Sequence, residues 1–131
     1  MTPPLPHVLV AEDNTLVADA MRLLFTETGH RVTTAGSIVE AVRVASTDPV
    51  DLLLLDLGLE DGDGVEVLDQ LRARDAMPRV AVALTGRDEP EVIERCRAAG
   101  CRDVLLKPVP VGDLLRKSRE WLNGAGAGHR P

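Results

Sequence analysis

Five apolar runs alternate along the chain with segments that carry helical spacing. The runs "HVLVA", "VDLLLLD" and "RVAVALT" are almost continuously apolar, which is typical of parallel strands covered by helices on both faces. A strand–helix alternation repeated five times predicts an α/β fold, a doubly wound (βα)5 sandwich around a parallel sheet. The five predicted strands span residues 7–11, 30–35, 50–56, 79–85 and 103–107.

The predicted helices have recognisable ends. Ser37 to Glu40 reads "SIVE", a capping box, and Pro90 suits the first turn of a helix that opens near Asp88. Helix ends are predicted at Gly29, at Gly100 and at Asn123–Gly124. At 131 residues the chain has room for one domain, expected over residues 7–122, with a flexible N-terminal arm (1–6) and a flexible glycine-rich tail (123–131).

Composition excludes several classes of function. The net charge of −6 and the scatter of the basic residues oppose direct binding to nucleic acid. The longest apolar runs are far below the roughly 18 residues that a membrane span needs, and "MTPPLP" does not resemble a secretory signal, so we expect a cytoplasmic protein. Cys96 and Cys101 lack zinc-ligand spacing and are interpreted as reduced structural thiols.

Polar side chains follow four of the five predicted strands. Glu12 and Asp13 come after the first strand and Asp56 ends the third. Thr85 ends the fourth strand and Lys107 ends the fifth. Because ligands of open α/β sheets bind beyond the carboxyl ends of the strands, we expect these side chains to gather at one rim.

Three clustered carboxylates repel one another unless a cation lies among them, and hard oxygen ligands suit Mg²⁺. A carboxylate such as Asp56 can also attack a phosphoryl group, provided that positive charge and hydrogen-bond donors meet the phosphoryl oxygens. Lys107 and the Thr85 hydroxyl supply them. The residues therefore predict a phosphoryl acceptor site with Asp56 as the nucleophile.

Over about residues 7–122 the chain resembles the receiver domain of two-component response regulators, of the chemotaxis-regulator type. The markers are "VLVAEDN", "LLLLDLGLEDGDG", "ALTG" and "LLKPV", in order and each at the end of the proper strand. The resemblance implies a flavodoxin-like fold with strand order 2-1-3-4-5. It also implies a signalling switch that catalyses only its own phosphorylation and dephosphorylation, and so is not an enzyme for other substrates.

The resemblance further implies a set of site residues and partners. Asp56 would accept a phosphoryl group from a phospho-histidine of a sensor histidine kinase or a phosphotransfer protein. Mg²⁺ is the expected metal, with Mn²⁺ as a second candidate, and Lys107 would contact the phosphoryl group through a loop that contains a cis bond to Pro108. The expected metal ligands are Glu12, Asp13, Asp56 and the backbone carbonyl of Gly58.

In such domains the threonine, here Thr85, moves toward the phosphoryl group, and the face of the fourth helix, fifth strand and fifth helix repacks. That face would bind a downstream protein target or a second copy of the chain. Val104 departs from the family, because an aromatic residue usually stands there and follows the threonine inward. Gly58 and Arg87 occupy positions that in the family tune hydrolysis of the aspartyl phosphate.

Other readings remain beside this one. A receiver-fold binding module with weak or absent switching is compatible with Val104. An aspartyl-nucleophile phosphohydrolase would need a second aspartate where Gly58 stands, and an FMN site is opposed by Glu12 and Asp13 in the loop that would hold the phosphate. We interpret Asp61 and Asp63 as turn and cap residues.

Several points stay open from the sequence alone: the cognate kinase and stimulus, the output pathway, the lifetime of the phosphorylated state and the oligomeric state. The nine residues after Leu122 are too few to form an output domain. The chain could act as a stand-alone regulator or a phosphorelay shuttle, or be a piece of a hybrid kinase or a larger regulator.

Overall fold

A five-stranded parallel sheet forms the centre of the molecule, with strand order β2-β1-β3-β6-β7. The computed structural model describes residues 4–127, with side chains up to residue 123. The order equals the predicted 2-1-3-4-5 once the strands of this sheet are counted along the chain, so the predicted fold class is confirmed. The strands are β1 (His7–Ala11), β2 (Arg31–Ala35), β3 (Leu52–Asp56), β6 (Val80–Thr85) and β7 (Asp103–Leu106).

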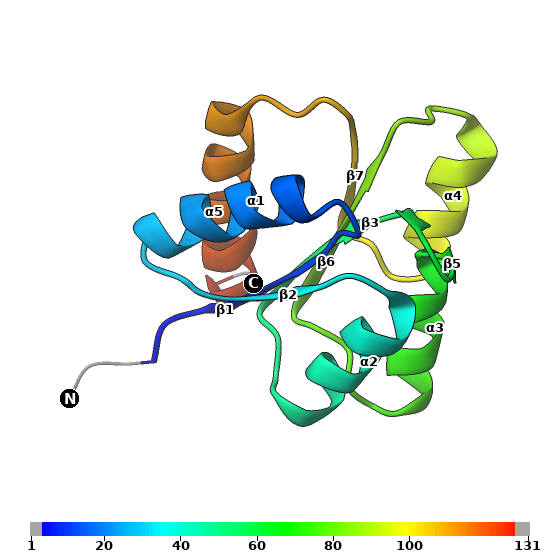
Figure 1. Cartoon of the computed structure of the whole chain (residues 1–131), viewed down its shortest axis with the longest axis horizontal. Helices are drawn as coiled ribbons and strands as arrows, with labels where there is room; N and C mark the ends of the chain where they lie inside the picture. The colour runs from blue at the N-terminus through cyan, green and yellow to red at the C-terminus, as the bar shows by residue number, and fades with distance from the viewer. Residues whose placement is uncertain (1–3, 128–131) are drawn as a thin grey trace.

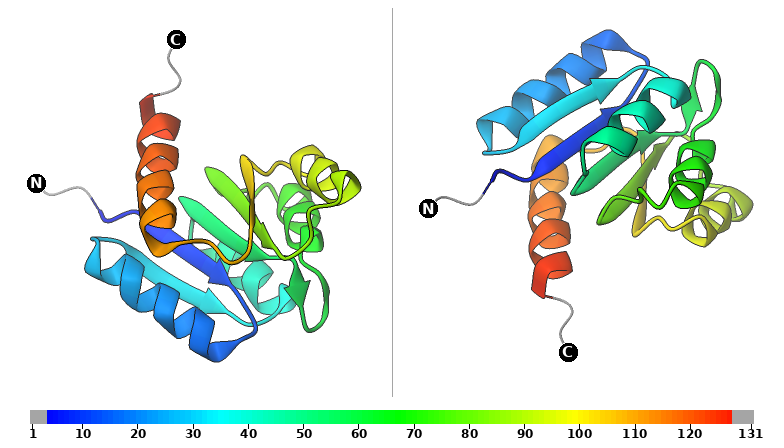
Figure 2. Two further views of the ribbon diagram at one scale, coloured as in Figure 1. Left: turned by 90° about the horizontal axis from the view of Figure 1, so that it is seen from above. Right: turned by 90° about the horizontal axis from the view of Figure 1, so that it is seen from below.

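Helices cover both faces of this sheet (Figures 1 and 2). One face packs against α1 (Thr15–Glu27) and α5 (Val111–Ala127), which lie together above the sheet in Figure 1. The opposite face packs against α2 (Ile38–Thr47), α3 (Val65–Ala73) and α4 (Pro90–Ala98). Among the described residues, none of these helices combines the length and the apolar character needed to cross a bilayer.

The leucines of β3 divide between two cores, because successive side chains of a strand point to opposite faces. Leu52 and Leu54 pack with Phe25 of α1 and Trp121 of α5, whereas Leu53 and Leu55 pack against α2 and α3. All four leucines have no exposed surface, and each such burial stabilises the fold by about 1.5–3 kcal/mol. This burial fixes the register of β3 and places Asp56 at the carboxyl edge of the sheet.

A small hairpin follows β3 and was not predicted from the sequence. Its strands, β4 (Gly58–Leu59) and β5 (Gly62–Asp63), pair antiparallel and stand at the carboxyl edge of the main sheet (Figure 2). Leu59 pairs with Gly62, so Glu60 and Asp61 form the two-residue turn of this hairpin. Gly62 adopts φ +147°, a conformation that L side chains rarely adopt.

Most predicted helix ends are confirmed. Ser37 Oγ accepts a hydrogen bond from Glu40 N at 3.1 Å, whereas the Glu40 carboxylate accepts from Gly36 N at 2.8 Å, one residue before the capping-box position. Pro90 is the first residue of α4. Gly29 and Gly100 end their helices with positive φ values of 93° and 112°.

The predicted end of the last helix is wrong. α5 continues through Asn123–Gly124 to Ala127. Extending an existing helix gains one hydrogen bond per residue, which offsets the cost of about 1 kcal/mol for each of Gly124 and Gly126. Residues 4–6 of the predicted N-terminal arm have no regular secondary structure. Residues 1–3 and 128–131 lie outside the described part of the chain, and the flexibility of both ends stays a prediction.

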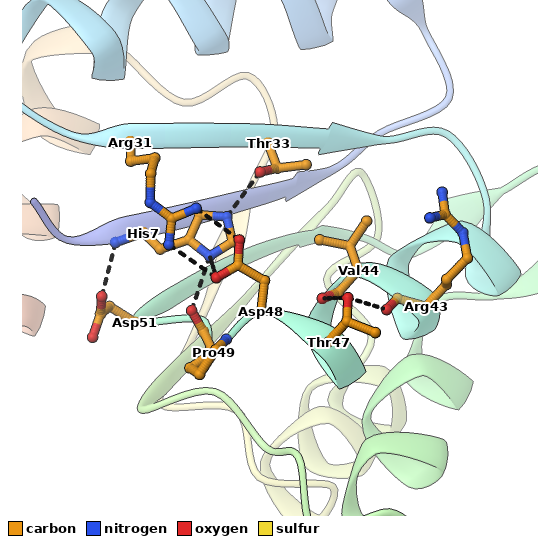
Figure 3. Close-up of polar contacts among 9 residues, drawn as sticks. All are labelled: His7, Arg31, Thr33, Arg43, Val44, Thr47, Asp48, Pro49 and Asp51. Atoms are coloured by element: carbon orange, nitrogen blue, oxygen red, sulfur yellow. Dashed lines mark hydrogen bonds and ion pairs between the residues drawn. The ribbon is translucent and has the colours of Figure 1, made fainter.

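The opposite rim of the sheet is held together around His7, whose ring is buried (Figure 3). His7 Nδ1 lies 2.9 Å from the carbonyl oxygen of Pro49 and therefore donates to it, while Nε2 lies 2.8 Å from Thr33 Oγ1. The backbone N–H of the same residue donates to Asp51 Oδ2 at 2.8 Å. His7 thus joins β1, β2 and the segment before β3 at the rim away from Asp56.

Candidate functional site

Three carboxylates meet at the carboxyl edge of the main sheet. Glu12 and Asp13 follow β1, and Asp56 ends β3, the strand that pairs with β1. One oxygen from each carboxylate lies within 4.8 Å of the others. Glu12 and Asp56 are each 7% exposed, and Asp13 is half-buried. The structure therefore brings together the acidic residues that the sequence placed at the ends of two separate strands.

Lys107 adds a positive charge to this cluster. Its Nζ lies 3.1 Å from Asp56 Oδ1 and 3.9 Å from Glu12 Oε1. The backbone N–H of Lys107 donates to the carbonyl of Thr85 at 2.8 Å, so the end of β7 is tied to the end of β6. The Lys107–Pro108 peptide bond is cis, as predicted. A single ammonium group does not balance three carboxylates, so the cluster as a whole stays acidic.

The electrostatics of Glu12 reflect this crowding. The pKa of Glu12 lies above its ordinary value, mainly because the carboxyl is buried, and the nearby Asp56 carboxylate raises it further. The Asn14 backbone N–H and the Lys107 ammonium lower the pKa of Glu12 but do not cancel this rise. Three hard carboxylate oxygens at this spacing with an excess of negative charge are the donor set that suits Mg²⁺. Glu12, Asp13 and Asp56 thus fit a hard divalent cation, and the Gly58 carbonyl stays a predicted ligand.

Thr85 closes β6 next to Asp56 and is 5% exposed. Its Oγ1 accepts a hydrogen bond from the Arg87 backbone N–H at 3.0 Å, which bends the chain away from the sheet. The Arg87 guanidinium donates from Nε to Glu89 Oε1 at 2.8 Å. The hydroxyl and the guanidinium both border the same cavity as Asp56.

That cavity has a volume of about 500 Å³. Along its wall lie two carboxylates, a hydroxyl and three cations, and the hydroxyl and the cations supply the chemistry required to receive a small anion. Gly58 leaves space beside Asp56, because a Cβ there would stand 3.9 Å from Asp56 Oδ1, an ordinary contact. The lining residues are Asp56, Leu57, Gly58, Asp63, Thr85, Gly86, Arg87, Val92, Arg95 and Lys107.

Gly64 permits the chain to turn tightly after Asp56. A Cβ at this position would stand 2.6 Å from the backbone oxygen of Asp56, closer than real contacts allow. Gly64 N also donates to Leu57 O at 2.9 Å. The residue is a glycine for steric reasons alone, since its φ of −57° suits any residue.

Two residues of the acceptor loop have roles that the sequence only half indicated. Asp63 accepts from Val65 N at 3.0 Å, a local turn just before α3, whose N-cap residue is Gly64 and not Asp63. Asp61 instead accepts from Ile38 N at 2.8 Å and from Val39 N at 3.3 Å, at the start of α2. The first of these N–H groups is the main cause that lowers the pKa of Asp61.

Arg95 is a lining residue that sequence reasoning missed. It lies on α4, pairs with Asp63 of the hairpin and borders the cavity beside Asp56. No local motif could have revealed it, because its partner stands 32 positions earlier in the chain. Val104, on β7, is half-buried and packs against the core on the side of α2, α3 and α4.

The comparisons with known proteins agree with this geometry. Residues 8–119 match the response regulator receiver domain family. The KDP operon transcriptional regulatory protein KdpE of Escherichia coli (strain K12) is 34% identical over 125 residues, which cover 95% of this chain and 55% of that protein. The chain thus spans about half the length of the curated transcriptional regulators that it matches.

Solved structures give the same answer. A CheY-like receiver domain protein from Methanospirillum hungatei JF-1 superposes with a TM-score of 0.87 at 26% identity, over 95% of this chain and 98% of that one. The receiver domain of the sensor histidine kinase PA1611 from Pseudomonas aeruginosa PAO1, solved with a magnesium ion coordinated in its active site cleft, superposes with a TM-score of 0.80 at 29% identity, over 92% and 99% of the two chains. The chain belongs to the response regulator receiver domain family of two-component signalling.

Proposed function

We propose that this domain is a phosphorylation-activated switch that accepts a phosphoryl group on Asp56 from a phospho-histidine of a sensor histidine kinase or a phosphotransfer protein. The observation that carries the proposal is the buried Asp56 carboxylate, which lies 3.1 Å from Lys107 Nζ beside the carboxylates of Glu12 and Asp13. Membership of the receiver family supports it, because receiver domains interact with histidine kinases and with downstream targets.

In the proposed reaction an oxygen of Asp56 attacks the phosphorus, and the new O–P bond forms as the N–P bond of the donor breaks. The electron pair of the broken bond leaves with the imidazole of the donor. Lys107 stabilises the negative charge on the phosphoryl oxygens, and the Thr85 hydroxyl donates to one of them after leaving Arg87 N. The domain thereby transfers the group to itself and turns over no other substrate.

Glu12, Asp13 and Asp56 would hold Mg²⁺, with the Gly58 carbonyl as a further ligand and Mn²⁺ as a substitute. The bound ion would neutralise charge on the phosphoryl oxygens. The magnesium ion in the cleft of the related PA1611 receiver domain supports this assignment. Gly58 and Arg87 would then set the lifetime of the aspartyl phosphate, Gly58 by leaving room for water and Arg87 by covering the site.

The proposed output is a change in the face formed by α4, β7 and α5, which would bind a downstream protein or a second copy of the chain. We place the switch in the cytoplasm, where buried free thiols such as Cys96 and Cys101 are ordinarily kept reduced. Nothing about the charge of the domain favours direct contact with nucleic acid.

A second candidate is a receiver-fold binding module whose face does not respond to phosphorylation. Val104 favours it, because a valine has no ring that could rotate with Thr85. This candidate is compatible with phosphorylation of Asp56, so the two candidates are separated by the response of the α4, β7 and α5 amides and not by labelling.

Incubation with acetyl phosphate and Mg²⁺, followed by intact mass measurement, tests the proposal. We expect the wild-type chain to gain the mass of one phosphoryl group and the Asp56→Asn variant to gain none. Wild-type protein without added mass, or equal labelling of both proteins, would contradict it. An Asp69→Asn variant serves as the matched control, because this carboxylate is exposed on α3 and outside the cavity.

A further inference from the structure

Arg95 of α4 forms an ion pair with Asp63 of the hairpin that follows the acceptor strand. Both side chains line the cavity that contains Asp56. The pair therefore connects two elements that are separate in the sequence: the loop that begins at the acceptor, and the second turn of a helix on the proposed output face. The contact is made by side chains alone, so it can be broken without loss of secondary structure.

The ion pair is weakly held. The side chain of Arg95 is 54% exposed and that of Asp63 is 40% exposed, and solvent-exposed ion pairs contribute little to stability. Asp63 does not depend on Arg95 for its own role, because its Oδ1 accepts from Val65 N at 3.0 Å while Oδ2 meets the guanidinium. Arg95 can thus leave Asp63 while the hydrogen bond from Val65 N to Asp63 remains in place.

A phosphoryl group on Asp56 would change the balance of charge inside the cavity. It carries close to two negative charges and three acceptor oxygens, and a planar guanidinium can bind two of these oxygens at once. Lys107 already contacts Asp56 at 3.1 Å, but a lysine ammonium is a single point of charge and leaves phosphoryl oxygens free. Arg95 borders the same cavity, and its planar guanidinium has the chemistry to bind them.

We propose that Arg95 is a positioning residue of the switch: when Asp56 is phosphorylated, its guanidinium exchanges Asp63 for the phosphoryl oxygens and moves α4 toward the site. This inference rests on the proposed function. The exchange of Asp63 for the phosphoryl oxygens would connect the acceptor to α4 without an aromatic side chain at position 104, where this chain has Val104. The hairpin would lose its tie to α4 in the same step.

Arg87 also borders the cavity, but its position in a loop gives it a different role from that of Arg95. It lies in the loop between β6 and α4, and its Nε pairs with Glu89 at 2.8 Å. A contact from Arg87 to the phosphoryl group would rearrange that loop without requiring the helix to move. The α4 amides therefore distinguish a helix response through Arg95 from a loop response through Arg87.

The test measures backbone amide chemical shifts by NMR with and without beryllofluoride and Mg²⁺, in wild type, Arg95→Gln and Arg97→Gln. Arg97 is exposed on the same helix and lines a different surface pocket, so it is the matched control. We expect wild type and Arg97→Gln to show shifts at Asp56, at Thr85 and along α4. In Arg95→Gln the shifts at Asp56 and Thr85 should persist, while the population of the shifted α4 state falls about tenfold, the factor expected for one charge-assisted hydrogen bond.

Two further variants sharpen the result. Arg95→Lys keeps the charge without the planar fork and should restore the α4 shifts in part. Asp63→Asn releases Arg95 from its partner, so its α4 shifts without beryllofluoride should already lie between those of the two wild-type states. Labelling by acetyl phosphate, measured by intact mass, confirms that each variant is folded and competent.

Failure of this inference differs from failure of the proposed function. If the wild type labels and the α4 response of Arg95→Gln equals that of the wild type, the exchange of partners is wrong while phosphorylation of Asp56 stands. If the wild type neither labels nor responds to beryllofluoride at Asp56, the proposed function and this inference fall together.

Discussion

Lys107 Nζ lies 3.1 Å from Asp56 Oδ1, although 51 positions separate the two residues in the sequence. The proximity results from the strand order, because Asp56 ends β3, Lys107 follows β7, and β6 lies between these strands. The long lysine side chain spans the width of one strand to reach the acceptor. A cation is therefore in place at the carboxylate before any phosphoryl group arrives.

Replacing this lysine should slow phosphorylation. We expect Lys107→Ala to reduce the initial rate of labelling by acetyl phosphate by about 10² to 10³, the effect of removing one group that stabilises developing negative charge. Time-resolved intact mass measures this rate. Lys117→Ala on α5 removes a cation that does not line the cavity and should label as the wild type does; comparable rates for the two variants would refute the role of Lys107.

Gly64→Ala should destabilise the fold. The added Cβ would stand 2.6 Å from the Asp56 backbone oxygen, and backbone atoms cannot move aside cheaply. We expect the free energy of unfolding in urea to fall by about 1–3 kcal/mol, the usual cost of overpacking. Gly36→Ala is the control, because its Cβ would meet Glu40 Oε1 at 4.0 Å, an ordinary contact. An equally stable Gly64→Ala would show that the loop relaxes without cost.

The pattern of apolar residues in the sequence is sufficient to predict the fold class. Near-continuous burial of β3 and β6 followed from "LLLLD" and "VAVALT", because strands covered on both faces need no polar alternation. The positions of Glu12, Asp56, Thr85 and Lys107 followed in turn, since each stands where a parallel strand ends. What the pattern could not reveal was the β4–β5 hairpin, whose strands are two residues long and too short for any periodicity.

Side-chain partners across the site were also beyond sequence reasoning. Asp61 lies in a turn, as predicted, but its carboxylate also accepts from Ile38 N at the start of α2, 23 positions earlier, and no local pattern reveals that contact. No sequence pattern marks Arg95 as a site residue, because an arginine on an exposed helix is ordinarily solvated. The end of α5 differs from the prediction for another reason: a helix that is already 13 residues long continues through Gly124 and Gly126, because extension is easier than nucleation.

The stability of the domain should depend on Asp51 at the rim opposite the site. Burial raises the pKa of Asp51, but the His7 N–H and the Arg79 guanidinium, at 2.8 and 2.9 Å, together bring it below its ordinary value of 3.8. A carboxylate whose pKa is lower in the folded state contributes stability above its unfolded pKa, and this contribution is lost as the pH falls through the folded pKa.

We therefore expect Asp51→Asn to lower the free energy of unfolding by about 1 kcal/mol near neutral pH, and the difference from wild type to shrink below about pH 4. Urea denaturation at a series of pH values measures it. Asp69→Asn, which removes an exposed carboxylate, should show no such trend. A cost that does not change with pH would mean that the ionised form of Asp51 is not what stabilises the rim.

The central claim is that Asp56 is the phosphoryl acceptor, and locating the phosphoryl group tests it most directly. Borohydride reduction of the acetyl-phosphate-labelled chain converts an aspartyl phosphate to homoserine, which tandem mass spectrometry of the peptides assigns to a single position. We predict homoserine at position 56, formed only when Mg²⁺ is present during labelling. Homoserine at Asp13 or at another aspartate, or none in a chain that carries added phosphoryl mass, would contradict the account.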